Sequence, residues 1–145
     1  MREWDRREVF AVRRDDDPDA LADDLEHACL NSRWWFIACV RDGLTPFDFE
    51  RPIALVGIWP NSPVSVLVNA IATDEFARIA LPLTRHLKHT VIPWMRARGV
   101  TRAECRCLKT HEQAVRWLTM LGARAECEVP GLGKNGETYL QMAWS

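Results

Sequence analysis

The chain has 145 residues, a formal net charge of -1 and 48% apolar residues. At this length a single core can bury about 70% of the surface that the unfolded chain exposes, so we expect one soluble domain over residues 1–145. The longest apolar run, Trp34 to Val40, is far shorter than the roughly 18 residues of a membrane span, and the charged N-terminus lacks the apolar segment of a signal peptide. The near-neutral charge removes the global electrostatic argument for binding nucleic acid.

The five cysteines are odd in number and include no C-x-x-C pair. This pattern argues against a disulfide framework and against a zinc ribbon, and it indicates a reducing cytoplasm. Cys105 and Cys107 alternate within a strand-like segment, so they share one face of a sheet and are expected to be small core residues.

The first half of the chain predicts a strand, a helix and three further strands. The segment from Glu8 to Arg14 is short and contains enough β-branched residues to predict a strand. Residues 18–30 predict a helix, because Pro18 suits a first turn and apolar residues recur every four positions. Three strands follow, and the last is apolar on both faces, as in the centre of a sheet: residues 34–43, 51–60 and 64–72.

From Glu75 to Arg98 the pattern is helical, beginning after the cap residues Thr73-Asp74. Pro82 and Pro93 each remove a backbone donor, so we expect a break or kink near each. Gly99 is expected to end the segment in a left-handed conformation. The remaining elements are a strand, an amphipathic helix that stops at Gly122 and an antiparallel hairpin: residues 101–109, 111–121 and 124–144.

This order predicts an α/β fold with a mixed, mostly antiparallel sheet of about six to seven strands and helices on both faces. Val64 to Ala72 and Arg102 to Lys109 are connected through a long helical segment. Parallel strands are normally joined in this way, so we expect these two to form a central parallel pair.

The segment from Met95 to Ala123, MRARGVTRAECRCLKTHEQAVRWLTMLGA, resembles the GCN5-related N-acetyltransferase (GNAT) superfamily. In that family a helix with an A-R-G-like stop feeds a strand, a polar turn that usually carries Asn, and a short helix ending in L-G-F. Here the turn is Lys109 to Glu112 and the ending is Leu121 to Ala123. The element order matches over nearly the whole chain, and the sequence motif over its last half. The resemblance implies a single GNAT-like domain and, for an active enzyme, acetyl-CoA as the cofactor.

The family's coenzyme-binding features are altered in this sequence. GNAT proteins hold the coenzyme A pyrophosphate on backbone amides of an Arg/Gln-x-x-Gly-x-Gly/Ala loop, because glycine lets the backbone approach the anion. Residues 73–83 contain no glycine, and Pro82 deletes an amide where donors are wanted. The family's catalytic Tyr falls on Leu118 and its Asn on His111, while the only tyrosine, Tyr139, lies in the closing strand. We therefore expect weak or absent acetyl-CoA binding and leave the catalytic residues unassigned.

The same departures resemble a narrower group, the GNAT-like virion proteins of short-tailed bacteriophages. These proteins keep a strand, a T/S-D helix cap, a basic helix without the glycine loop, and an R-[WF]-L-x-x-[IL]-G helix, here Arg116 to Gly122. The resemblance implies a protein associated with the phage particle, located in the host cytoplasm or the virion. It does not imply acetyltransferase activity.

If acetyl-CoA binds, the resemblance places its pantetheine arm on exposed backbone where the central strands splay, at Asn69, Ala70, Ile71 and Ala72. Arg78 and Arg85 would then be the phosphate ligands. With Lys88 they share one side of a helix, so the alternatives are an ordinary solvated face or, with weaker support, a contact to nucleic acid.

The histidines allow two interpretations each. His111 either acts as a general base or ligand holder, or it is a surface residue that caps the following helix. His86 and His89 are spaced like a metal-binding pair, but no carboxylate or cysteine pattern completes a tetrahedral set. We therefore predict no metal site.

Large aromatic residues near loops and termini indicate a protein partner. Phe47 and Phe49 lie in an expected connection, and Trp144 is one residue from the end. We expect one of them to contact a second copy of the chain or a larger assembly, since exposed aromatics often anchor interfaces. The alternative is that all three fold back over a small core.

Three classes of function remain open. The first is a catalytically silent, GNAT-fold binding or assembly protein of phage type. The second is an acetyl-CoA-dependent N-acetyltransferase of unknown acceptor, and the third is a nucleic-acid-associated module that uses the basic helix. The missing glycine loop favours the first class over the second.

Overall fold

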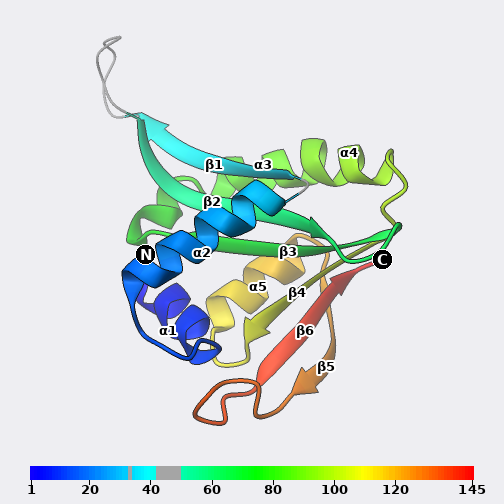
Figure 1. Ribbon diagram of the computed structural model, residues 1–145. Coiled ribbons are helices and arrows are strands. Elements are labelled where there is room, and N and C mark those ends of the chain that lie inside the picture. The colour runs from blue at the N-terminus through cyan, green and yellow to red at the C-terminus, as the bar shows by residue number, and fades with distance from the viewer. Residues whose placement is uncertain (33, 42–49) are drawn as a thin grey trace.

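The computed structural model describes residues 1–32, 34–41 and 50–145, and its six strands form one sheet in the order β1-β2-β3-β4-β6-β5 (Figure 1). The β3 and β4 strands are parallel, and the other pairings between described strands are antiparallel. This confirms the α/β class and the central parallel pair. The strands are β1 (Trp34–Arg41), β2 (Glu50–Pro60), β3 (Ser65–Ala72), β4 (Arg102–Leu108), β5 (Arg124–Val129) and β6 (Tyr139–Trp144).

Helices precede, connect and follow these strands. The second helix begins as expected, because Pro18 occupies its first turn and the Asp17 side chain accepts the Asp19 N–H. Within the described residues no helix is long and apolar enough to cross a membrane. The helices are α1 (Glu3–Ala11), α2 (Pro18–Asn31), the 3-10 helix η1 (Asp74–Arg78), α3 (Ala80–His86), the π-helix η2 (Leu87–Val91), α4 (Ile92–Arg96) and α5 (Glu112–Met120).

The strand expected at Glu8 to Arg14 is wrong, because residues 3–11 form the helix α1. The β-branched segment that suggested a strand is preceded by helix formers, and Glu3 and Asp5 place acids in the first turn, where the helix dipole favours them. Contacts of α1 with the ends of β3 and β4, described below, hold it there. Tertiary packing thus overrides the local strand preference.

The helical segment after β3 is broken, as the two prolines predict. Pro82 lies in the first turn of α3, Pro93 lies in the first turn of α4, and the π-helix η2 separates them. Gly99 ends the segment with a φ of 83°. The expected side-chain cap is wrong, because Thr73 makes no capping hydrogen bond and its buried hydroxyl has no partner among the described residues.

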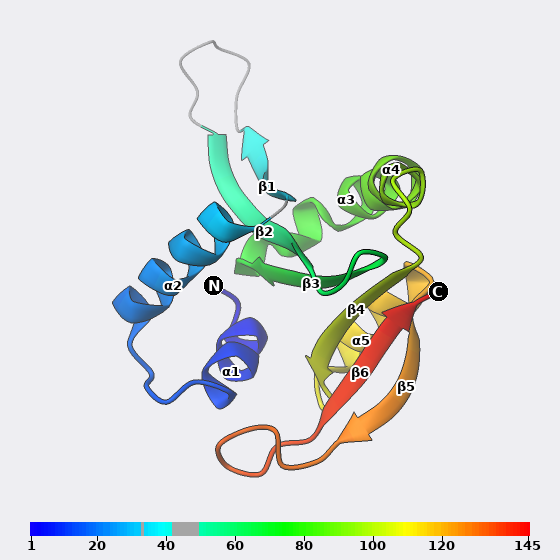
Figure 2. The same ribbon diagram turned by 45° about the vertical axis from the view of Figure 1, so that its right-hand side comes forward.

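Helices cover both faces of the sheet (Figure 2). Neighbouring residues on a strand point to opposite faces, and on β2 Ile58 enters the main core while the Trp59 indole N–H donates to the Ala28 carbonyl of α2 at 3.0 Å. The α5 helix lies on the side of α3, because the Trp117 indole N–H donates to the Thr84 hydroxyl at 2.8 Å. The main core includes Leu83, Leu87, Val91 and Met95 from α3, η2 and α4.

The parallel pair is joined only at its beginning. Its register runs from Ser65 opposite Arg102 to Leu67 opposite Glu104, and no further pairing joins β3 to β4 within the described residues. Figure 2 shows the two strands running apart beyond this point, with α1 near their diverging ends. The splay expected for the central strands is therefore present.

Candidate functional site

The N-terminal helix α1 bridges the diverging ends of β3 and β4. At the end of β3, the Ala72 N–H donates to Asp5 Oδ2 at 2.6 Å, and the Ala72 carbonyl accepts the Arg2 N–H at 2.7 Å. At the end of β4, the Leu108 N–H donates to Glu8 Oε1 at 2.8 Å. Two acidic side chains, one turn apart on a single helix, therefore satisfy backbone donors on both strands.

Asp5 is buried, with 5% of its surface exposed, and is paired with Arg2. The Arg2 guanidinium donates to Asp5 Oδ1 at 2.6 Å and to Oδ2 at 3.1 Å. The same guanidinium lies 4.5 Å from the ring centroid of Phe76. A charge-assisted pair of this kind satisfies a buried carboxylate and fixes the start of α1 at the end of β3.

Glu8 also faces His111, the residue that directly precedes α5. His111 Nδ1 lies 2.9 Å from Glu8 Oε2, and only 2% of His111 is exposed. The Trp4 ring stacks on the imidazole, with centroids 5.3 Å apart and an interplanar angle of 13°. His111 Nε2 is buried and has no hydrogen-bond partner among the described residues. An ionised Glu8 favours the proton on Nδ1, which leaves the Nε2 lone pair free to accept.

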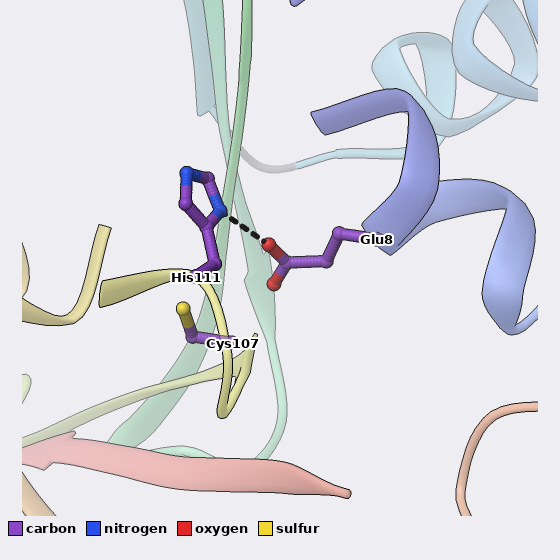
Figure 3. A group of neighbouring side chains, drawn as sticks. All are labelled: Glu8, Cys107 and His111. Carbon is purple, nitrogen blue, oxygen red and sulfur yellow. Dashed lines mark hydrogen bonds and ion pairs between the residues drawn. The ribbon is translucent and has the colours of Figure 1, made fainter. Parts of the chain in front are cut away.

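Cys107 on β4 completes this cluster, as Figure 3 shows. One ligand atom each from Glu8, Cys107 and His111 lies within 4.8 Å of the others. Burial, and then the charge of Glu8, raise the pKa of the Cys107 thiol, so this side chain is a protonated thiol at neutral pH. Its Sγ lies 3.7 Å from the Leu108 carbonyl, to which it donates a weak hydrogen bond.

Tyr139 on β6 contacts the backbone of Glu8. Its hydroxyl donates to the Glu8 backbone carbonyl at 2.6 Å. Burial raises the pKa of Tyr139 to about 12, and the charge of Glu8 adds to this effect, so the phenol remains a donor throughout the neutral range. The Tyr139 hydroxyl therefore helps to hold α1 in place.

A largely apolar cavity of about 1000 Å³ extends along the diverging strands. Glu8, Cys107 and His111 are among its lining residues, with Phe76 and Trp117 from the helices on the other side. The cavity brings the polar cluster next to a space large enough for a small molecule.

The residues predicted to bind the coenzyme divide into two groups. Asn69 and Ala70 are exposed, Ile71 is partly buried and Ala72 is buried, and all four line the cavity together with His111. The Ala72 backbone is not free, because its N–H donates to Asp5 of α1 and its carbonyl accepts the N–H of Arg2, the residue that precedes α1. Arg78 and Arg85 are exposed and stand apart from the cavity's lining residues; Arg78 donates to Glu75 at 2.8 Å.

One expectation for a single residue is corrected. His111 is not a surface cap: it is buried and makes no side-chain capping hydrogen bond. Trp144, one of the three aromatic residues expected at a partner contact, is partly buried, because it packs on the core and its indole N–H donates to the Leu121 carbonyl at 3.1 Å. Cys105 and Cys107 do pack together against one small core cluster, as predicted. Phe47 and Phe49 lie outside the described residues.

Asp5 and Glu8 were missed by the sequence analysis. The stretch that contains Glu8 was interpreted as a strand, and no local pattern marks either acid as the partner of a strand end more than 60 residues away. Correct assignment of α1 would have put both acids on one helical face, three residues apart. Their partners become visible only in the folded chain.

Comparison with known proteins identifies the fold. No family model matches the chain, and no curated protein matches it. Solved structures do match: Ard1 from Thermoplasma volcanium has a TM-score of 0.67 at 12% identity, covering 95% of this chain and 86% of that one. A ribosomal-protein-S5-alanine acetyltransferase from Vibrio fischeri has a TM-score of 0.59 at 15% identity, covering 87% and 68%.

A GNAT-family acetyltransferase from Streptococcus pneumoniae matches with a TM-score of 0.55 at 14% identity. This match covers 65% of the present chain, which spans only 59% of the streptococcal protein. Identities this low carry the architecture and not the activity. The six-stranded mixed sheet, its splayed parallel pair and these matches together show that the chain has the fold of the GNAT acetyltransferases.

Proposed function

We propose that this protein is a GNAT-fold binding or assembly protein with a degenerate acetyl-CoA site, of the type associated with phage particles. The observation that carries the proposal is the engagement of Ala72 by α1. The strand end on which a pantetheine arm was expected to pair is occupied by Arg2 and Asp5 of the same chain. A ligand at this end would have to displace Asp5, which is buried, and its partner Arg2, which is 20% exposed.

The expected pyrophosphate site supports the same proposal. Pro82 lies in the first turn of α3, where it supplies no amide donor, and residues 73–83 contain no glycine. Arg78, one of the two expected phosphate ligands, already donates to Glu75. A pyrophosphate with few donors recovers little of the hydration that it loses on binding.

An apolar strip on the sheet edge supports a protein partner. The β1 strand ends the sheet order, and Trp35 and Ile37 on its outward face are 46% and 48% exposed. Cys39 continues the strip. Exposed apolar residues on an edge strand are typical of surfaces that meet another chain. This strip replaces Trp144 as the better anchor for the proposed contact with a second copy or an assembly partner.

Calorimetric titration with acetyl-CoA tests the degenerate site. We expect no binding in the low-micromolar range, and native mass spectrometry of freshly purified protein should show no bound coenzyme A. A low-micromolar dissociation constant would contradict the proposal. The Arg85→Ala variant serves as a control, because coenzyme binding through the predicted phosphate ligands would weaken in it.

Sedimentation tests the apolar strip. A Trp35→Ser, Ile37→Ser double variant should reduce any self-association of the wild-type protein. The matched control is Met120→Ser, which removes a side chain that is 61% exposed on α5, away from β1. Equal self-association of the double variant and the wild type would exclude the strip as the contact.

The second candidate is an acetyl-CoA-dependent N-acetyltransferase, and the Glu8–His111 pair favours it. The Nε2 atom can accept the proton that an amine loses as its nitrogen attacks the acetyl carbonyl, while the carbon–sulfur bond breaks and coenzyme A leaves as the thiolate. Release of free coenzyme A thiol in the presence of amine acceptors would support this function. His111→Gln should abolish the release and His89→Gln, a change at an exposed position, should not.

A further inference from the structure

We propose that Glu8, Cys107 and His111 form a binding site for one divalent transition metal ion, with Zn²⁺ as the best-matched ion. This inference goes beyond the proposed function and does not depend on coenzyme binding. The three residues come from α1, from β4 and from the turn that precedes α5 (Figure 3). Glu8 lies 103 residues before His111 in the sequence, so no local spacing joins all three residues into a metal-binding pattern.

The distances suit a small ion. One ligand atom from each residue lies within 4.8 Å of the others, and Glu8 Oε2 is 2.9 Å from His111 Nδ1. Bonds of about 2.0 to 2.3 Å to a tetrahedral zinc ion separate its ligand atoms by roughly 3.3 to 3.8 Å. To bind the ion, Glu8 Oε2 and His111 Nδ1 would therefore have to move slightly apart, and Cys107 Sγ would have to move closer to both. Each of these distances would change by about an ångström or less.

Contacts around the cluster fix the orientation of Glu8 and His111. The Leu108 N–H binds Glu8 Oε1 and leaves Oε2 directed at the imidazole. The Trp4 ring stacks on His111 and restricts its rotation, and the Tyr139 hydroxyl holds the Glu8 backbone. Outer contacts of this kind orient metal ligands and strengthen binding. They also keep the cost of ordering the site low, because the ligands are fixed before the ion arrives.

The charges of the cluster favour a divalent ion. Cys107 and His111 are buried, and 18% of the Glu8 side chain is exposed. Binding of Zn²⁺ displaces the Cys107 thiol proton to solvent, because the thiolate is the form that ligates a metal ion. The ion, the thiolate and the carboxylate then sum to zero, which is the favourable state in a buried site.

The donor set selects the class of ion. One sulfur, one imidazole nitrogen and one carboxylate oxygen match Zn²⁺ or Co²⁺, whereas Mg²⁺ and Ca²⁺ prefer oxygen donors. Three protein ligands leave the fourth position open, and the cavity that all three residues line can supply a water molecule there.

Metal binding by the purified full chain tests this inference. Zn²⁺ is titrated at pH 8 in competition with a chromophoric chelator, and Co²⁺ is added separately to record its spectrum. We expect one equivalent of Zn²⁺ per chain and a near-ultraviolet sulfur-to-cobalt charge-transfer band. Cys107→Ser and His111→Gln should each weaken Zn²⁺ binding more than about 10-fold. Cys127→Ser and His89→Gln are the matched controls, since both residues are exposed, and they should bind as the wild type does.

Circular dichroism of each metal-free variant shows whether it is folded. Wild-type protein that binds no stoichiometric Zn²⁺, or a folded Cys107→Ser variant with unchanged affinity, would overturn the inference. If the buried variants do not fold, the cobalt spectrum of the wild type decides: bound Co²⁺ without a sulfur band excludes Cys107 as a ligand. None of these readouts requires acetyl-CoA, so the test of the metal site is independent of the test of the proposed function.

Discussion

The two ends of the β3–β4 pair are held by different means. At the beginning, three residue pairs from Ser65–Arg102 to Leu67–Glu104 join the strands in parallel register. At the far end the strands have separated, and the side chains of Asp5 and Glu8 on α1 bind one backbone N–H on each. The first end depends on main-chain geometry, and the second depends on a few residues of the N-terminal helix.

This difference shows that the backbone groups between the separated strands are partly satisfied by the chain itself and are not all available to a ligand. Separation of two neighbouring strands exposes backbone groups that need partners. Here α1 supplies partners for Ala72 and Leu108 from within the chain, and the same helix places Glu8 beside His111. The splayed end is therefore sensitive to single side-chain changes, whereas the paired end should tolerate them.

The largest effect is expected for Asp5→Ala. The substitution leaves the Ala72 N–H and the Arg2 guanidinium without their acceptor in a buried setting. Breaking a buried pair of this kind should lower the free energy of unfolding by about 3 to 4 kcal/mol. Urea unfolding followed by circular dichroism measures the change.

Two controls sharpen this result. Asp5→Asn keeps an oxygen for the Ala72 N–H and should cost less than Asp5→Ala. Asp15→Ala, which removes an exposed partner of Arg13, should cost less than about 1 kcal/mol. An Asp5→Ala effect no larger than that of Asp15→Ala would mean that α1 does not hold the end of β3.

The next effect in size is expected for Glu8→Ala. It removes the acceptor of the Leu108 N–H and the partner of His111 Nδ1, and we expect a loss of about 2 to 3 kcal/mol in the free energy of unfolding. Amide hydrogen exchange at Leu108 should accelerate by a larger factor than exchange at Ala103, which pairs with β6. Equal acceleration at both positions would indicate global destabilisation without a local opening.

The fold was largely predictable from the sequence, and the site was not. The central strands are marked by short apolar runs, and the broken helix by two prolines, so local patterns were sufficient for both. The α1 helix was missed because Val9 and Phe10 have strand preferences, and its helical state depends on contacts with strands far along the chain. The Glu8–Cys107–His111 cluster depends on that helix, so the error in this one element concealed Glu8 as the partner of His111 and Cys107.

Alkaline pH should lower the free energy of unfolding by less than Glu8→Ala does, through two thiols on β4. Burial raises the pKa of Cys105 to about 12 and also raises that of Cys107, while the thiols of the unfolded chain titrate near about 8.5. Above that pH the unfolded state loses thiol protons that the folded state retains, so stability present below about pH 8.5 falls as the pH rises. Between pH 8 and pH 9 we expect the two thiols together to lower the free energy of unfolding by about 1 to 2 kcal/mol.

Urea unfolding at the two pH values measures this loss, with Cys105→Ala as the comparison. The variant lacks one of the two shifted thiols, so its free energy of unfolding should fall less between pH 8 and pH 9 than that of the wild type. Cys127→Ala removes an exposed thiol and should leave the wild-type dependence unchanged. A pH dependence that is the same in all three proteins would assign the loss to other groups.

The smallest effect is expected at the paired end, for Thr101→Ala. The Thr101 hydroxyl donates to the Val64 carbonyl at 3.3 Å, but the same carbonyl also accepts the backbone N–H of Thr101 at 2.9 Å and that of Arg102 at 3.3 Å. Because both backbone bonds survive and the hydroxyl is exposed, the free energy of unfolding should change by no more than about 0.5 kcal/mol. A loss comparable to that of Glu8→Ala would show that side chains hold both ends of the strand pair. The contrast between the two ends would then disappear.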